Sequence, residues 1–246
     1  ILQSFTDANA LFVGLLVGIL VTLLYVKLAD SGKLTIKLPD SVPPNVSQSF
    51  AVLLPVAVTI VVVSVVGFIF NNFVGQNIFK VIATIMAPLQ AIMTGLPGYL
   101  VCVFLMQLLW FFGIHGPNVL SAVTTAFMTK AAMENLAHYS ATGNAYTAPN
   151  IICNPFGSTF FSMTGSGITG GLIIAILLFS KRDDYKAIAK LAIPCGIFDI
   201  NEPIIFGIPM VMNPIFAVPF FAAPIVSVVI GYVLTKIGFF PHMVVD

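Results

Sequence analysis

Long stretches without a charged side chain most limit how this chain can fold. Five such stretches lack Asp, Glu, Lys and Arg: residues 8–26, 41–79, 81–129, 135–180 and 203–235. A helix needs about 20 apolar residues to cross the hydrocarbon core of a bilayer. Only 8% of the 246 residues are charged, whereas soluble domains carry about 25%. The sequence therefore predicts an all-α, polytopic membrane protein.

The charged and sulfur-containing residues exclude several functional classes. Ten basic and nine acidic residues give a net charge of +1, which leaves no basic surface for nucleic acid. Cys102, Cys153 and Cys195 are far apart and lie in apolar surroundings. This spacing favours neither a metal site nor a disulfide framework, and we expect no metal and no cofactor.

Apolar and polar segments alternate in an order that predicts individual spans. Full-length spans are expected at residues 11–28, 50–70 and 215–234. Lysine-containing loops at residues 27–49 and 181–190 favour the cytoplasmic side, because such loops retain Lys and Arg.

Two shorter features lie between these spans. Residues 33–37 alternate polar and apolar side chains, so a short hairpin strand is possible there. Residues 78–94 suit an amphipathic linking helix at the membrane surface. The chain opens on Ile1 without an initiator Met, and we expect it to be part of a longer protein.

A polar break at residues 199–207, with the sequence DINEPIIFG, interrupts this apolar region. A carboxylate such as Glu202 is costly inside a membrane, so it is usually paired, hydrogen-bonded or directed into an aqueous cavity. Pro203 biases Glu202 away from helical geometry. Residues 110–118 form an earlier break that contains Trp110 and His115. Paired breaks of this kind indicate a substrate site in transporters.

The two breaks carry complementary chemistry for a neutral, hydroxyl-rich ligand. Glu202 can accept hydrogen bonds, and His115 can donate or accept according to its tautomer. Trp110 could offer a flat apolar face to a sugar ring. Structural roles remain open: Glu202 could anchor the broken backbone, His115 could be a core histidine, and Trp110 could lie at the membrane–water interface. Asp199 could cap a helix or pair with Lys130.

The residues around both breaks resemble a known family. WFFGIHG at residues 110–116 and GIFDINEPIIFGIPMVMNP at residues 196–214 are similar to EIIC, the membrane component of a sugar phosphotransferase system. Supporting similarities are IKLPDSVPP at 36–44, MTGSG at 163–167 and RDDYK at 182–186. The lactose, cellobiose and N,N′-diacetylchitobiose branch is the most similar.

This resemblance implies a fold like that of the EIIC glucose superfamily, with transmembrane helices and two re-entrant hairpins containing broken helices. It implies a homodimer embedded in the lipid bilayer of a bacterial cytoplasmic membrane. Residues 1–77 would end an N-terminal dimerisation and scaffold region, and residues 78–94 would link it to the next region. Residues 95–246 would form the sugar-binding transport region with both hairpins.

The resemblance also implies the residues of the site and the partners. His115 and Glu202 would contact the bound disaccharide, with Glu202 near the hydroxyl that becomes phosphorylated. Trp110, Gly116 and Asn201 would complete the sugar-binding set. The phosphoryl donor would be a phosphocysteine on EIIB, since no cysteine here lies in a context resembling that donor.

Two other functional classes remain open at this point. The chain could be an ion-coupled secondary transporter in which Glu202 is the proton or sodium site. It could also be a purely structural or channel subunit.

Asp199 departs from the family, in which Asn or Gln often stands at this position.

Overall fold

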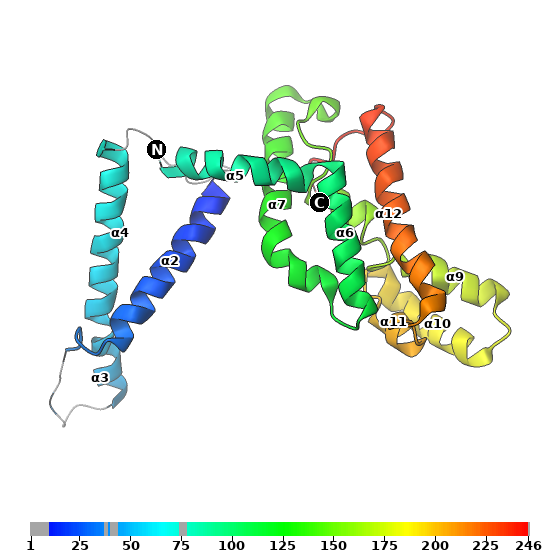
Figure 1. The fold of residues 1–246 in the computed structure, drawn as a ribbon, viewed down its shortest axis with the longest axis horizontal. Coiled ribbons are helices and arrows are strands. Elements are labelled where there is room, and N and C mark those ends of the chain that lie inside the picture. The colour runs from blue at the N-terminus through cyan, green and yellow to red at the C-terminus, as the bar shows by residue number, and fades with distance from the viewer. Residues whose placement is uncertain (1–9, 37–38, 40–43, 74–77, 246) are drawn as a thin grey trace. The chain divides into compact units, whose positions relative to one another are not determined.

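The computed structural model describes residues 10–36, 39, 44–73 and 78–245 of the chain. Its elements fall into two compact units, residues 1–87 and residues 88–246. Every regular element in the described ranges is helical (Figure 1), which confirms the predicted all-α class. The possible strand at 33–37 does not form in its described part, residues 33–36, and Lys37 lies outside the described residues.

The first unit is built from two long apolar helices. Helix α2 spans Ala10–Asp30, α3 spans Pro44–Ala51 and α4 spans Leu53–Phe73. Helices α2 and α4 pack on each other. Helix α3 begins within the segment that the sequence predicted to be a polar connection, and α4 extends a few residues beyond the predicted span.

Large apolar side chains of this unit face outward. Leu20, Ile60 and Phe68 are 64%, 61% and 62% exposed. In the described ranges, three helical segments are long and apolar enough to cross a membrane: Phe12–Asp30, Ser49–Phe70 and Pro214–Lys236. A bilayer or neighbouring helices would remove these side chains from water, which is the main driving force for burial.

Helix α5, Ile78–Thr94, covers the predicted linking segment, and the boundary between the two units falls within it at Ala87 and Pro88. The second unit then contains these elements in order: α6 (Leu96–Phe111), α7 (Gly116–Thr142), the 3-10 helix η1 (Ala145–Thr147), α8 (Asn154–Phe160), α9 (Thr169–Phe179), α10 (Asp183–Ile197), α11 (Glu202–Gly207) and α12 (Pro214–Lys236). Helix α6 packs against both α7 and α12 (Figure 1).

Two hydrophobic clusters hold this second unit together. One joins α6, α7, α8 and α12 through buried residues such as Val103, Ala131 and Phe156. The other joins the end of α6 to α9, α10 and α11 through residues such as Trp110 and Ile204. Fully burying one such large apolar side chain contributes about 1.5–3 kcal/mol. The second cluster brings the two predicted breaks into one region of the fold.

A buried polar network ties α5 to α7. Lys130 is 7% exposed, and its Nζ donates to Gln90 Oε1 over 2.6 Å and to Glu134 Oε1. Glu134 Oε2 also accepts from Asn150 Nδ2 over 2.9 Å. The predicted pairing of Lys130 with Asp199 is therefore wrong, because the ammonium group is engaged within its own helix and with α5.

In contrast to the hydrogen-bonded side chains around Lys130, the buried amide of Gln107 on α6 has no partner among the described residues. It is 0% exposed, and neither its Oε1 nor its Nε2 has a hydrogen-bond partner among the described residues. Unsatisfied buried polar atoms are rare in native structures and each one invites an explanation. Trp110, one turn later on the same helix, has an equally unpartnered Nε1.

We predict that Glu134→Ala lowers the apparent Tm of the full-length protein in detergent. Breaking a fully buried ion pair costs about 3–5 kcal/mol because the remaining charge stays buried, and a smaller loss is expected here because the Glu134 side chain is 31% exposed. Combining Lys130→Met with Glu134→Leu removes both charges and should recover most of the loss. An unchanged Tm for Glu134→Ala would contradict the role of this pair.

We predict that Gln107→Leu raises the apparent Tm, because leucine replaces two unpartnered polar atoms at a fully buried position. Mutational data put the cost of such unsatisfied groups at about 1–3 kcal/mol. Gln90→Leu is the matched control and should lower the Tm, since its amide is bonded to Lys130. Destabilisation by Gln107→Leu would show that this amide has a partner in the native protein.

Candidate functional site

The turn between α6 and α7 places His115. Helix α6 ends at Phe111, and Gly113 adopts a left-handed φ of 81° that reverses the chain. Helix α7 then begins with Gly116 and a proline, which favours a first helical turn because it has no N–H to leave unpaired. A side chain at Gly116 would collide with the backbone of Met106, so this glycine lets the two helices approach closely.

His115 caps the start of α7, and this hydrogen bond determines which tautomer the neutral ring adopts. Its Nδ1 accepts a hydrogen bond from the backbone N–H of Asn118 over 3.2 Å. A neutral imidazole that accepts at Nδ1 carries its proton at Nε2. His115 therefore presents an N–H donor on the side of the ring away from its own helix.

The turn between α10 and α11 places Glu202. Helix α10 ends at Ile197, and Asp199 takes a left-handed φ of 60°. Asn201 precedes the short helix α11, in which Glu202 is the first residue and Pro203 the second. The carboxylate is thus held where the helix is interrupted. Charged side chains in membrane proteins usually lie at such positions, because burying them in lipid costs free energy.

The loop between α8 and α9, residues 161–168, supports this turn from the other side. The backbone N–H of Thr164 donates to Asp199 Oδ1 over 2.6 Å, and Asn201 Nδ2 donates to the carbonyl of Ser166 over 2.6 Å. Gly165 packs so closely on Asn201 that an added Cβ would lie 2.5 Å from Asn201 Cβ. The turn before Glu202 is therefore held by two short hydrogen bonds and a close backbone contact.

The segment that follows α11 is bonded to the first break. The backbone N–H of Met212 donates to the carbonyl of Phe111 over 2.9 Å. Gly113 lies beside Val211, whose Cγ1 would be 3.5 Å from an added Cβ. Two segments about a hundred residues apart in sequence thus lie side by side.

His115 and Glu202 meet as a result of these contacts. His115 Nε2 lies 3.7 Å from Glu202 Oε1, with the two side chains 36% and 42% exposed. This separation exceeds the usual 2.7–3.2 Å of a direct N–H···O bond. A ligand hydroxyl could accept from His115 and donate to Glu202 at the same time, so the pair is suited to orienting one hydroxyl.

Trp110 lies behind this pair. Its ring centroid is 4.5 Å from that of His115 and 6.1 Å from that of Phe206. Trp110 is 2% exposed, so it supports the imidazole from within the fold. Its direct contact with a sugar stays a prediction.

In this structure the remaining predicted residues pack or hydrogen-bond with the backbone around the site. Gly116 allows α7 to begin against α6, and Asn201, 3% exposed, holds the loop that contains Ser166. Asp199 accepts from the backbone N–H of Thr164 in the loop at 161–168, so it fills neither of its two predicted roles, which were capping a helix and pairing with Lys130. Sugar contacts by Gly116 and Asn201 stay predictions.

Two features of this region were not assigned to the site from sequence. The loop at 161–168 was noted only for its Gly, Ser and Thr content, although its left-handed residues Thr164, Gly165, Gly167 and Ile168 shape the turn before Glu202. Gln107 was missed altogether. A glutamine within the uncharged stretch 81–129 is the signal that could have marked it.

Comparison with known proteins gives consistent results. The family model for the phosphotransferase system EIIC matches residues 1–224. The oligo-beta-mannoside-specific EIIC component of Bacillus subtilis is 37% identical over 236 residues, which cover 95% of this chain and 52% of that protein. The lactose-specific EIICB component of Streptococcus mutans is 32% identical over 232 residues, 92% of this chain and 39% of that protein.

The crystal structure of ChbC, the IIC component of the N,N′-diacetylchitobiose-specific phosphotransferase system, has the same fold. It superposes with a TM-score of 0.88 at 32% identity, covering 95% of this chain and 54% of ChbC. The chain therefore spans about half the length of the relatives that it matches. On these similarities, the chain belongs to the EIIC family of the phosphotransferase system.

Proposed function

We propose that this chain is part of a sugar permease that binds a β-linked disaccharide and carries it across the bacterial cytoplasmic membrane for phosphorylation by EIIB. The approach of His115 Nε2 to Glu202 Oε1, 3.7 Å apart, is the observation that carries the proposal. The pair joins two helical breaks, which is where transporters hold their substrates. The names of the matched relatives support a sugar ligand of this class.

The two side chains define how the sugar would be held. Glu202 accepts a hydrogen bond from the sugar hydroxyl that will react, and His115 donates to the oxygen of the same hydroxyl. Trp110 keeps the imidazole in place through ring contact. Positioning of the nucleophile is a sufficient catalytic role in phosphoryl transfer, where most of the rate comes from orientation and electrostatics.

The phosphoryl group would come from a phosphocysteine on EIIB. The sugar oxygen forms a bond to phosphorus while the sulfur–phosphorus bond breaks, and the hydroxyl proton passes to Glu202 or to water. The description of the Streptococcus mutans relative as an EIICB component supports EIIB as the partner. Phosphorylation removes the sugar from the transport equilibrium and so drives uptake.

The two compact units support a division of labour within a homodimer. Residues 1–77 serve as the end of the dimerisation scaffold, because their helices expose large apolar side chains that a second copy or lipid would cover. Residues 95–246 form the transport region that contains His115 and Glu202. The helix at 78–94 links the two.

We predict that Glu202→Gln and His115→Ala each weaken binding of the preferred disaccharide by about 10- to 100-fold. Glu202→Gln replaces a charged acceptor by a neutral amide oxygen, and His115→Ala removes the Nε2–H donor. A hydrogen bond to a charged group contributes about 1.5–3 kcal/mol, and a group left unpaired at the site costs about 1–3 kcal/mol. Isothermal titration of the full-length protein with lactose, cellobiose and N,N′-diacetylchitobiose measures this loss and identifies the preferred sugar.

Asp184→Asn and His138→Ala are the matched controls. Asp184 is an exposed carboxylate bound to Arg182, and His138 contacts Thr147 at the far end of α7. Both controls should bind the sugar as the wild-type protein does. Wild-type affinity in both Glu202→Gln and His115→Ala would remove the proposed site.

We predict that uptake into vesicles depends on phosphorylated EIIB and not on an ion gradient. Vesicles supplied with phospho-EIIB should accumulate sugar phosphate without a proton or sodium gradient. Accumulation of unmodified sugar, driven by a gradient in the absence of EIIB, would instead establish the ion-coupled alternative with Glu202 as the ion site.

A further inference from the structure

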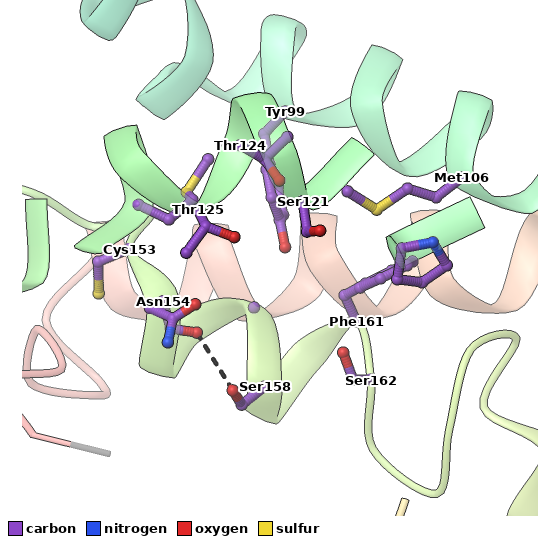
Figure 2. Close-up of a pocket in the computed structure, with 13 residues that line it drawn as sticks. Tyr99, Met106, Ser121, Thr124, Thr125, Cys153, Asn154, Ser158, Phe161 and Ser162 are labelled. Atoms are coloured by element: carbon purple, nitrogen blue, oxygen red, sulfur yellow. Dashed lines mark hydrogen bonds between the residues drawn. The ribbon is translucent and has the colours of Figure 1, made fainter. Parts of the chain in front are cut away.

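Half of the charged residues of the second unit lie in one short segment. Six of its twelve Asp, Glu, Lys and Arg residues fall between positions 181 and 190. The cavity between α6, α7 and α8, by contrast, is lined by uncharged residues such as Tyr99 and Thr125 (Figure 2). The charged segment joins α9 to α10 and forms the first turns of α10 (Figure 1). A local group of charges of this kind indicates a surface that meets a charged partner.

Arg182 is neutralised within this segment. Its Nε and Nη2 donate to the carboxylate of Asp184 over 3.1 and 2.5 Å. The guanidinium carbon lies 3.9 Å from the centre of the Tyr185 ring. Such a two-pronged contact between arginine and a carboxylate fixes both side chains. Arg182 and Asp184 therefore add no net charge to the surface.

Three lysines of the segment keep a free charge. Lys181, Lys186 and Lys190 form no ion pair in the parts of the chain that the structure describes. Lys181 and Lys190 are exposed, and Lys186 is half-buried. Lys186 and Lys190 are four residues apart on α10, so they lie on one face of the helix. With four basic and two acidic residues, the segment has a net charge of +2.

Large apolar side chains are exposed directly beside these lysines. Leu178 and Phe179 at the end of α9 are 68% and 79% exposed, and Leu191 of α10 is 74% exposed. Phe179 lies two residues before Lys181, and Leu191 follows Lys190. Helices α9 and α10 also pack against each other. Residues 178–191, which we call the α9–α10 surface, thus present cations next to apolar side chains.

This combination matches the chemistry of an anionic phospholipid. Such a lipid carries a phosphate group directly beside its hydrocarbon chains. Lysine side chains near a membrane cover apolar surface with their stems and hold the ammonium group at the level of the headgroups. A soluble acidic partner would neutralise the lysines, but Leu178, Phe179 and Leu191 gain most from a partner that also supplies hydrocarbon.

We propose that the α9–α10 surface binds an anionic phospholipid of the cytoplasmic leaflet. Lys181, Lys186 and Lys190 bind the phosphate group, and the exposed apolar residues of the surface contact the acyl chains. The cytoplasmic side follows from the excess of lysine and arginine in this segment. The proposal does not depend on sugar binding and goes beyond the proposed function.

The test titrates the full-length protein in detergent with two lipids. Phosphatidylglycerol is anionic, and phosphatidylcholine has no net charge. Native mass spectrometry measures the bound lipid and its Kd, and the apparent Tm serves as the check on folding. The wild-type protein should bind phosphatidylglycerol more tightly by about tenfold or more, because the free lysines favour a negative headgroup.

The combined variant Lys181→Gln, Lys186→Gln and Lys190→Gln tests the charges. Each lysine near an anionic membrane surface contributes about fivefold in affinity, the equivalent of about 1 kcal/mol. The triple variant should therefore weaken phosphatidylglycerol by about 100-fold and leave phosphatidylcholine within about twofold of wild type. The matched control changes the same three lysines to arginine, which keeps the charge and should keep the preference for phosphatidylglycerol.

Leu191→Gln tests the apolar contact, with Ile230→Gln as its matched control. Both residues are exposed, but Ile230 lies on α12, which packs against α6 and α8. Leu191→Gln should weaken both lipids by about threefold to tenfold, as partial burial of one leucine predicts. Ile230→Gln should leave the Kd of the bound phosphatidylglycerol unchanged.

Several outcomes would overturn the lipid site. Equal affinity of the wild-type protein for the two lipids is one, and wild-type affinity of the triple glutamine variant for phosphatidylglycerol is another. An equal loss in the glutamine and arginine variants would show that the charge is not what binds.

Two further arms identify other partners. If inorganic phosphate alone raises the apparent Tm as much as phosphatidylglycerol does, the lysines bind a free anion and the lipid assignment is wrong. If the triple glutamine variant loses phospho-EIIB binding but keeps phosphatidylglycerol, the surface belongs to EIIB. Neither result alters the sugar titrations of Glu202→Gln and His115→Ala, so the proposed function is tested separately.

Discussion

The structure depends on satisfying backbone groups where helices are interrupted. Inside a membrane protein no bulk water is present to bond a free N–H or C=O, so irregular backbone persists only where protein groups or an aqueous cavity supply partners. Here the hydrogen-bond partners come from segments that are distant in sequence. Met212 bonds to Phe111, Thr164 to Asp199, and Asn201 to Ser166. These three hydrogen bonds connect three segments that are distant in sequence.

The same contacts create the geometry of the site. The end of α6 is bonded to the segment after α11, because the N–H of Met212 donates to the carbonyl of Phe111. The turn before α11 is held by the loop at 161–168. His115 and Glu202 then face each other at a distance suited to a bridging hydroxyl. The cap that His115 makes at α7 adds to this arrangement, since it directs the ring proton outward. The residues that end these helices are thus the same residues that form the proposed site.

The class of fold and the approximate site were predictable from sequence because both follow from local patterns. Uncharged stretches determine where spans can lie, and a carboxylate followed by a proline in an otherwise apolar segment marks Glu202. Long-range pairing was harder to predict. Asp199 had several chemically reasonable partners, and only the fold shows that it binds Thr164 and that Lys130 binds Gln90 and Glu134. The burial of Trp110 and Gln107 was equally inaccessible, because it depends on how α6 packs against elements far along the chain.

Four non-glycine residues with left-handed backbones lie in the loops around Glu202: Thr164, Ile168, Asp199 and Met212. Such conformations cost on the order of 1–3 kcal/mol each and persist only when the surroundings impose them. A conformational change that frees these residues would recover part of that energy. Moving a two-state equilibrium from one end to the other takes about 5.5 kcal/mol, so relief at a few of these positions is of the right size. The loops around Glu202 therefore store backbone strain that a rearrangement of this region would release.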